Sequence, residues 1–182
     1  MIYDAIVIGT GGVGSAALYH LAGRGARVLG IDRYAPGHHR GSSHGQTHII
    51  RQAYSEHADY VPLLKRAFEL WSELEEGRSE PLYHETGILQ VGPADGAVLP
   101  GVLASAAEHD LAVESLTAAE AADRFPGFVV PDALSAVFEE QAGYLWSRIA
   151  CGHKSSWPAA TGRSCASAAR SSAGSHPATG WS

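Results

Sequence analysis

Residues 3–32, YDAIVIGTGGVGSAALYHLAGRGARVLGID, contain two apolar segments separated by a glycine-rich turn and a helical segment. The first apolar segment is nearly continuous and β-branched at its centre, which is typical of a strand buried on both faces of a parallel sheet. Gly9, Gly11 and Gly14 follow at the spacing G-x-G-x-x-G, and the second apolar segment ends in Asp32. This order of strand, turn, helix, strand and acid predicts a Rossmann-like α/β unit that binds a dinucleotide.

Each glycine of the turn has a physical role in such a unit. Gly9 permits the tight exit from the strand, and Gly11 lets the backbone approach a diphosphate. Gly14 allows the helix to pack closely on the sheet, while the amino end of the helix faces the anion. Gly12 and Val13 lie in the same turn and complete this part of the predicted cofactor site.

The segment that follows the turn is predicted to be a helix. Val13, Ala17 and Leu21 are expected to share its buried face, and Gly25 is expected to end it in a left-handed conformation. Leu18 stands where many flavin-binding sequences have a further small residue, which weakens the match at this position.

The acid at the end of the second strand restricts the cofactor. Asp32 is placed to accept hydrogen bonds from a ribose hydroxyl, and its charge would repel a 2′-phosphate, so NADP is disfavoured. Arg33 follows it directly and is included in the predicted cofactor site. Both NAD and FAD satisfy this pattern, so the motif leaves the choice between them open.

A long loop rich in glycine, serine and histidine follows the second strand, whereas an NAD-binding unit would usually continue quickly into another helix and strand. This loop argues against an NAD-linked dehydrogenase. We expect its residues His38 and His39 to lie in a solvated turn. No carboxylate or cysteine stands at metal-ligand spacing from these histidines, so no metal site is predicted.

The sequence GSSHGQTHIIRQAY at 41–54, followed by YVPLLKRAFELWSELE at 60–75, resembles the monomeric sarcosine oxidase and N-methyltryptophan oxidase family of D-amino-acid-oxidase-like flavoproteins. The resemblance covers about residues 2–145 and continues through TGILQVGP at 86–93 and RFPGFVVPDALSAVFEEQAGYL at 124–145. It implies that the cofactor is FAD.

The resemblance also implies roles for particular residues. Ser42, Ser43 and Thr47 would lie along the flavin cofactor, and Arg51 would pair with the carboxylate of the substrate. A guanidinium suits that task because its planar fork matches a carboxylate. His48 would lie near the flavin face, where the family typically has an arginine; a histidine is shorter and not permanently charged.

The activity implied by the resemblance is FAD-dependent oxidation of N-methyl or secondary amino acids, with molecular oxygen as the acceptor and hydrogen peroxide as a product. The expected partners are therefore a small amino-acid substrate and oxygen. Two alternatives stay open: an NAD-linked dehydrogenase, and a non-catalytic nucleotide-binding remnant.

The sequence predicts three regions. Residues 1–78 are expected to form the first part of the FAD-binding domain, and 79–142 the start of an α+β substrate domain with short strands and two helices. Residues 60–76 are predicted to be a helix capped by Asp59, and a stripe of its apolar residues is expected in the core: Val61, Leu64, Ala67, Phe68, Trp71 and Leu74. Residues 143–182 form the third region.

The charge distribution separates this third region from the rest. All nineteen acidic residues lie at or before Leu145, and the remaining 37 residues contain four basic residues and no acid. The acidic body argues against nucleic-acid and membrane partners, and we expect a cytoplasmic monomer. The only cysteines, Cys151 and Cys165, offer no disulfide framework.

The composition change near Leu145 suggests a shifted reading frame or another truncating error. A serine- and alanine-rich segment of this kind is expected to be irregular and disordered, because it buries little apolar surface. The chain alone is then expected to be inactive. The rival interpretation is a genuine flexible tail, and the downstream gene sequence distinguishes the two.

Overall fold

The computed structural model describes residues 2–35, 37–76, 78–146 and 164–167. The chain divides into two compact units, of which the first contains residues 1–45 and 147–182 and the second contains residues 46–146.

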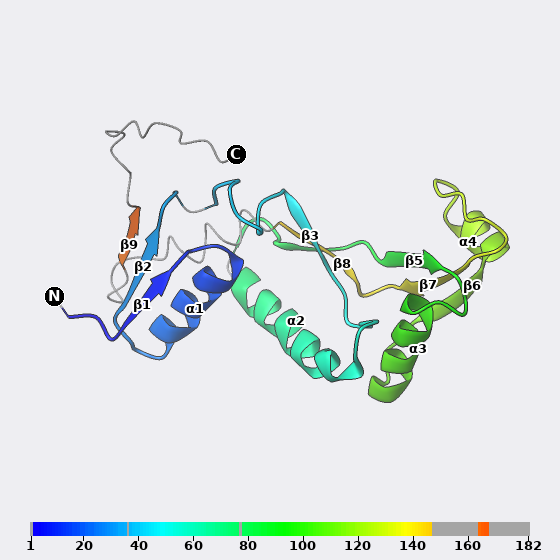
Figure 1. Ribbon diagram of the computed structural model, residues 1–182, viewed down its shortest axis with the longest axis horizontal. Helices are drawn as coiled ribbons and strands as arrows, with labels where there is room; N and C mark the ends of the chain where they lie inside the picture. The colour runs from blue at the N-terminus through cyan, green and yellow to red at the C-terminus, as the bar shows by residue number, and fades with distance from the viewer. Residues whose placement is uncertain (1, 36, 77, 147–163, 168–182) are drawn as a thin grey trace, which may run out of the picture. The chain divides into compact units, whose positions relative to one another are not determined.

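The first unit is built on a parallel sheet. Strand β1 (Ala5–Ile8) leads into helix α1 (Gly12–Gly23), which returns the chain to strand β2 (Val28–Asp32) (Figure 1). The two strands pair in parallel, from Ala5 opposite Val28 to Ile8 opposite Ile31. The predicted Rossmann-like βαβ unit is therefore confirmed.

A third strand, β9 (Ser164–Ser167), pairs in parallel with β2 and gives the sheet order β1-β2-β9. These four residues differ from the irregular segment expected from their composition. Strand pairing joins backbone N–H and C=O groups, and the outer edge of β2 offers such groups whatever the side chains of its partner are. The rest of 147–182 lies outside the described residues.

Helix α1 packs on the sheet through a different face from the one predicted. Its buried residues are Ser15, Leu18 and Ala22, whereas Val13 is 88% exposed. The helix ends as expected, because Gly25 adopts a φ of 86° just beyond it. Apolar residues lie on more than one side of this helix, so their spacing alone does not identify the buried face. The close approach of Gly14 to Gly9 and Val7 turns the Gly14 side of the helix toward the strands.

The packing around Leu18 explains how the sheet accepts a large residue at this position. Leu18 is 6% exposed and belongs to a core cluster with Ala22 and Val28. A Cβ atom added to Gly30 of β2 would lie 2.6 Å from Leu18 Cδ1, which is closer than real Cβ contacts. The absence of a side chain at Gly30 therefore makes room for the large side chain of Leu18.

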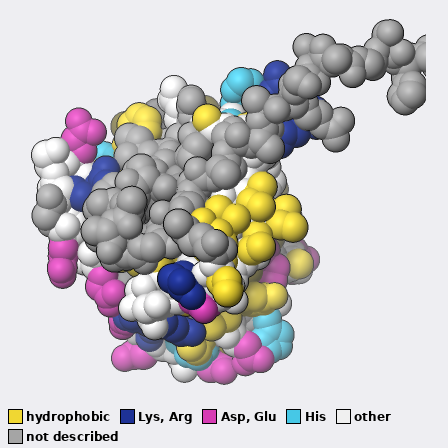
Figure 2. Space-filling model, turned by 90° about the vertical axis from the view of Figure 1, so that its left-hand side faces the viewer, with side chains coloured by type: hydrophobic (Ala, Val, Ile, Leu, Met, Phe, Trp, Pro, Cys, Tyr) yellow, Lys and Arg dark blue, Asp and Glu magenta, His cyan; other side chains and the backbone are white. Residues whose placement is uncertain are grey.

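The β1 side chains on the other face of this sheet are apolar. Ala5 and Val7 pack with the α1 cluster, while Ile6 and Ile8 of β1 are 58% and 87% exposed. Figure 2 shows apolar side chains gathered on one face of the molecule, next to small separate groups of acidic and basic side chains. Among the described residues, α1 covers one side of the sheet.

The second unit contains two antiparallel sheets. The first has the order β3-β8-β4 and the second the order β5-β7-β6. Their strands are β3 (Thr47–Ile50), β4 (Tyr83–Glu85), β5 (Ile88–Gly92), β6 (Glu114–Thr117), β7 (Ser135–Glu139) and β8 (Gly143–Trp146). The helices are the 3-10 turn η1 (Ala58–Tyr60), α2 (Val61–Glu75), α3 (Val98–His109) and α4 (Ala118–Arg124).

Helices α3 and α4 pack on opposite faces of the second sheet (Figure 1). Val137 of β7 clusters with Leu99 and Val102 of α3, and its neighbour Ala136 clusters with the α4 residues. Successive side chains of a strand point to opposite faces, so one strand serves both helices. A capping box begins α4: the Thr117 side chain accepts from the Glu120 N–H, and the Glu120 side chain accepts from the Thr117 N–H.

Strand pairing explains where the two compact units divide. Strand β8 pairs with both β3 and β4, so residues 143–146 belong with the second unit rather than with the tail. The same pairing draws residues 47–50 into the second unit. Long-range strand pairing, which local patterns do not reveal, sets both boundaries.

The predicted helix at 60–76 is confirmed as α2, but two details differ. Asp59 lies inside η1 and does not cap α2, whose N-cap residue Tyr60 makes no side-chain cap bond. In the predicted core stripe, Val61 and Leu74 are buried and the four residues between them are half-buried. Over the described part of the chain, no helix has the length and apolar character needed to cross a membrane.

Candidate functional site

The glycine turn between β1 and α1 has the close packing that its sequence predicts. Gly9 adopts a φ of 90°, a conformation that favours glycine, and its N–H donates to Ile31 O at 2.8 Å. A Cβ atom on Gly14 would lie 1.8 Å from Gly9 O. Gly11 is the N-cap residue of α1, so the turn delivers the chain directly to the amino end of the helix.

Asp32 joins this turn to the end of β2. Its Oδ2 atom accepts hydrogen bonds from the Thr10 N–H at 2.6 Å and the Thr10 hydroxyl at 3.1 Å, and Oδ1 accepts from the Tyr34 N–H at 2.9 Å. Burial alone would raise the pKa of Asp32, but the hydrogen bonds from Thr10 and Tyr34, with a smaller contribution from His38, lower it overall. The carboxylate is thus held in its charged form.

The solvated turn expected for His38 is wrong, because its side chain lies against Asp32. Its Nε2 atom is 3.5 Å from Asp32 Oδ1, and the side chain is 20% exposed. The neighbouring His39 is exposed, as expected. The sequence carries no local signal for this difference, because the contact depends on how the loop folds back over β2.

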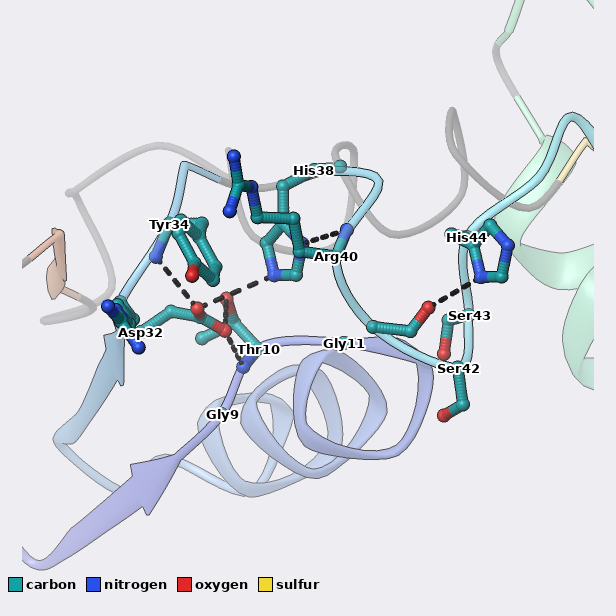
Figure 3. Close-up of a pocket in the computed structure, with 13 residues that line it drawn as sticks. Gly9, Thr10, Gly11, Asp32, Tyr34, His38, Arg40, Ser42, Ser43 and His44 are labelled. Carbon is teal, nitrogen blue, oxygen red and sulfur yellow. Dashed lines mark hydrogen bonds and ion pairs between the residues drawn. The ribbon is translucent and has the colours of Figure 1, made fainter. Parts of the chain in front are cut away.

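The loop after β2 closes a cavity of about 310 Å³ over the glycine turn, within the first unit (Figure 3). That volume is at the lower end of the range of about 300–1,000 Å³ found for small-molecule sites. The lining residues are Gly9, Thr10, Gly11, Asp32, Arg33, Tyr34, Gly37, His38, Arg40, Gly41, Ser42, Ser43 and His44. The turn, the acid and the two serines predicted for the cofactor site thus share one cavity.

Ser43 also contacts the start of α1. The Gly12 N–H donates to Ser43 Oγ at 3.0 Å, which leaves the hydroxyl hydrogen of Ser43 able to donate to a ligand oxygen. Of the remaining predicted cofactor residues, Val13 is exposed and does not line the cavity, and Gly14 acts through its packing.

Thr47, His48 and Arg51 lie in the second unit. Thr47 and His48 are successive residues of β3, opposite Trp146 and Leu145 respectively, so their side chains point to opposite faces of the sheet. Both are exposed. The side chains of Thr47 and His48 therefore do not share one surface of the sheet. The resemblance to the oxidase family does not by itself predict this difference.

Arg51 follows β3 and is half-buried. Its guanidinium carbon lies 4.9 Å from the ring centroid of Tyr54, within the range of a cation–π contact. Its Nε atom is buried and has no hydrogen-bond partner among the described residues. The planar face of the guanidinium is thus held against an aromatic ring.

Sequence reasoning missed the residue that holds the segment after Arg51. Glu139 is 2% exposed and accepts hydrogen bonds from the N–H groups of Gln52 at 2.7 Å and Ala53 at 3.1 Å. Ser105 of α3 donates to Tyr54 O at 2.5 Å. The sequence does show an acid at the end of the apolar strand β7, which could have indicated a buried carboxylate. Its hydrogen-bond partners could not be identified locally, because they lie 86 and 87 residues away in the sequence.

No group of three or more histidine, cysteine, aspartate or glutamate side chains is arranged to hold a metal ion in the part of the chain that the structure describes.

Comparison with known proteins gives a consistent family assignment. Residues 4–151 match the model of a family described as FAD dependent oxidoreductase. N-methyl-L-tryptophan oxidases of Yersinia pestis (strain Pestoides F) and Yersinia pseudotuberculosis are 46% identical over 150 residues, which are 82% of this chain and 40% of those proteins. The chain thus spans about two-fifths of the length of these relatives.

Similar solved structures include a variant of NikD, an unusual amino acid oxidase essential for nikkomycin biosynthesis. It is 26% identical to this chain, with a TM-score of 0.76, and the match covers 91% of this chain and 43% of that chain. Iminodiacetate oxidase from Chelativorans sp. BNC1 is 25% identical with a TM-score of 0.67 over 90% and 46% of the two chains. L-proline dehydrogenase from P. horikoshii, 24% identical with a TM-score of 0.71 over 91% and 44%, shares the fold.

The close approach of Gly14 to Gly9 predicts a large difference between two glycine substitutions in α1. Gly14→Ala should lower the free energy of unfolding by about 3 kcal/mol or more, because its Cβ atom would overlap the Gly9 carbonyl. Gly23→Ala is the matched control, since nothing lies within 4 Å of its added Cβ atom, and it should raise stability by up to about 1 kcal/mol. Urea unfolding measures both, and equal effects would contradict the packing.

The lowered pKa of Asp32 predicts a pH-dependent contribution to stability. A group whose pKa is lower in the folded state stabilises the fold above its unfolded pKa, here 3.8, and loses that contribution as the pH falls through the folded value. The difference in unfolding free energy between the native chain and Asp32→Asn should therefore be complete above about pH 4 and decrease below it. Urea titrations over this pH range measure the difference, and a difference independent of pH would refute this role.

Proposed function

Because the chain belongs to the FAD-dependent oxidoreductase family, we propose that its first unit binds the adenosine diphosphate half of FAD and that the protein oxidises N-methyl or secondary amino acids. The observation that carries the proposal is the cavity shared by the glycine turn, Asp32 and the serine loop. The identity of 46% to N-methyl-L-tryptophan oxidases supports the amino-acid substrate class.

The residues of the cavity fit the cofactor. Gly11 lines the cavity at the amino end of α1, where N–H groups and the helix dipole favour a diphosphate. Asp32 offers a charged acceptor for a ribose hydroxyl, and Ser42 and Ser43 offer hydroxyl donors. Bound FAD supplies a two-electron acceptor for the oxidation of a carbon next to nitrogen.

Two observations favour FAD over the alternatives. The family description names FAD, and the chain continues from β2 into the long loop that closes the cavity rather than directly into another helix and strand. An NAD-linked dehydrogenase and a non-catalytic nucleotide-binding module therefore rank behind the oxidase. Molecular oxygen is the proposed acceptor that completes the reaction, with release of hydrogen peroxide.

We assign the carboxylate of the substrate to Arg51. The guanidinium is held over Tyr54, and the backbone of the segment that follows is held by Glu139, so the cation is oriented before a ligand arrives. Its planar fork of N–H donors matches the geometry of a carboxylate. His48 stays a weaker candidate, as an exposed residue of β3.

A cytoplasmic location and a monomeric state remain proposals. The first rests on the absence of cysteine from residues 1–145, and the second on the resemblance to the monomeric oxidases.

Nucleotide binding tests the proposed function directly. The 182-residue chain should bind FAD and ADP-ribose, measured by calorimetry, and Asp32→Asn should weaken both by about tenfold because a charged acceptor is lost. Glu114→Gln removes an acid outside the cavity and should bind as the native chain does. A native, folded chain that binds neither ligand would contradict the proposal.

The role of Arg51 is tested by the NMR signal of its Nε–H group. Titration with N-methyl-L-tryptophan should shift this signal, because a carboxylate bound to the guanidinium changes the electronic environment of the Nε–H group. The methyl ester of the same compound is the control and should leave the signal unchanged. A response to both compounds, or to neither, would exclude carboxylate recognition by this residue.

A further inference from the structure

The ring of His38 links three parts of the wall of the cavity. Nε2 faces Asp32 Oδ1 at 3.5 Å, and Nδ1 accepts a hydrogen bond from the Arg40 N–H at 3.0 Å. The ring also meets the Tyr34 ring edge-on, with centroids 4.9 Å apart. In Figure 3, His38 lies beside the carboxylate on the loop that closes the cavity.

These contacts assign the tautomer of the ring. Because Nδ1 accepts the Arg40 N–H, it carries no hydrogen, so the single ring hydrogen of the neutral form is on Nε2. That hydrogen faces Asp32. The imidazole of His38 thus lies against a carboxylate that already accepts the N–H groups of Thr10 and Tyr34.

We propose that His38 is a positioning residue that acts through Asp32 to make the site selective for a nucleotide with a free ribose 2′-hydroxyl. This inference rests on the proposed nucleotide binding. The hydrogen bonds from Thr10 and Tyr34 and the imidazole packed beside Oδ1 fix the plane of the carboxylate. A fixed charged acceptor discriminates against a ligand without the matching hydroxyl, because one of its acceptor sites is then left unpaired. The contact at 3.5 Å is the longest of those on Asp32, so Oδ1 remains the oxygen most open to a further donor.

The test compares the affinities of ADP and 2′-deoxy-ADP, which differ only in the 2′-hydroxyl. At about pH 8 the native chain should prefer ADP by about tenfold. His38→Gln keeps a polar group beside the carboxylate and should retain about this preference. His38→Ala removes the contact and should show only about a twofold preference.

His39→Ala is the matched control, because His39 is exposed and does not line the cavity, and it should behave as the native chain does. Thermal unfolding of each variant verifies that it is folded, and His38→Gln tests the proposal even where His38→Ala does not fold. A full preference in a folded His38→Ala variant, or loss of the preference in a folded His38→Gln variant, overturns the role of His38 while the proposed function stands. A native chain that binds neither nucleotide overturns both.

Discussion

The first unit depends on one buried carboxylate that accepts backbone N–H groups from two segments. Asp32, at the end of β2, receives the N–H of Thr10 from the glycine turn and the N–H of Tyr34 from the loop that follows it. Hydrogen bonds to a charged group contribute about 1.5–3 kcal/mol each, which is enough to fix the separation of turn and loop. The cavity between them is a consequence of this bond, and the candidate ligand groups gather around it.

The second unit uses the same device around a different residue. Glu139, at the end of β7, accepts the N–H groups of Gln52 and Ala53 directly after Arg51. A buried acid is costly unless it is hydrogen-bonded, and here two backbone donors compensate it. In both units a carboxylate at the end of a strand fixes the segment that carries a candidate ligand-binding side chain.

The sequence predicted those features of the molecule for which a local pattern of residues is compatible with one structure only. The sequence predicted the turn because only glycine permits the close approach of residues 9 and 14. It predicted the position of Asp32 because the second apolar segment ends at this residue, as β2 does. His38 and Glu139 were not predictable, because their partners depend on loop conformation and on pairing across more than eighty residues. Strand β9 was missed because parallel pairing uses the backbone, which composition does not report.

The central claim is that the turn before α1 and Asp32 together hold an adenosine diphosphate group. A crystal structure of the chain with ADP-ribose tests it most directly. The account predicts the diphosphate beside Gly11 and Gly12 at the amino end of α1, with a ribose hydroxyl at about 2.7 Å from an Asp32 carboxylate oxygen. A ligand bound elsewhere, or a ribose that leaves Asp32 without a contact, would contradict it.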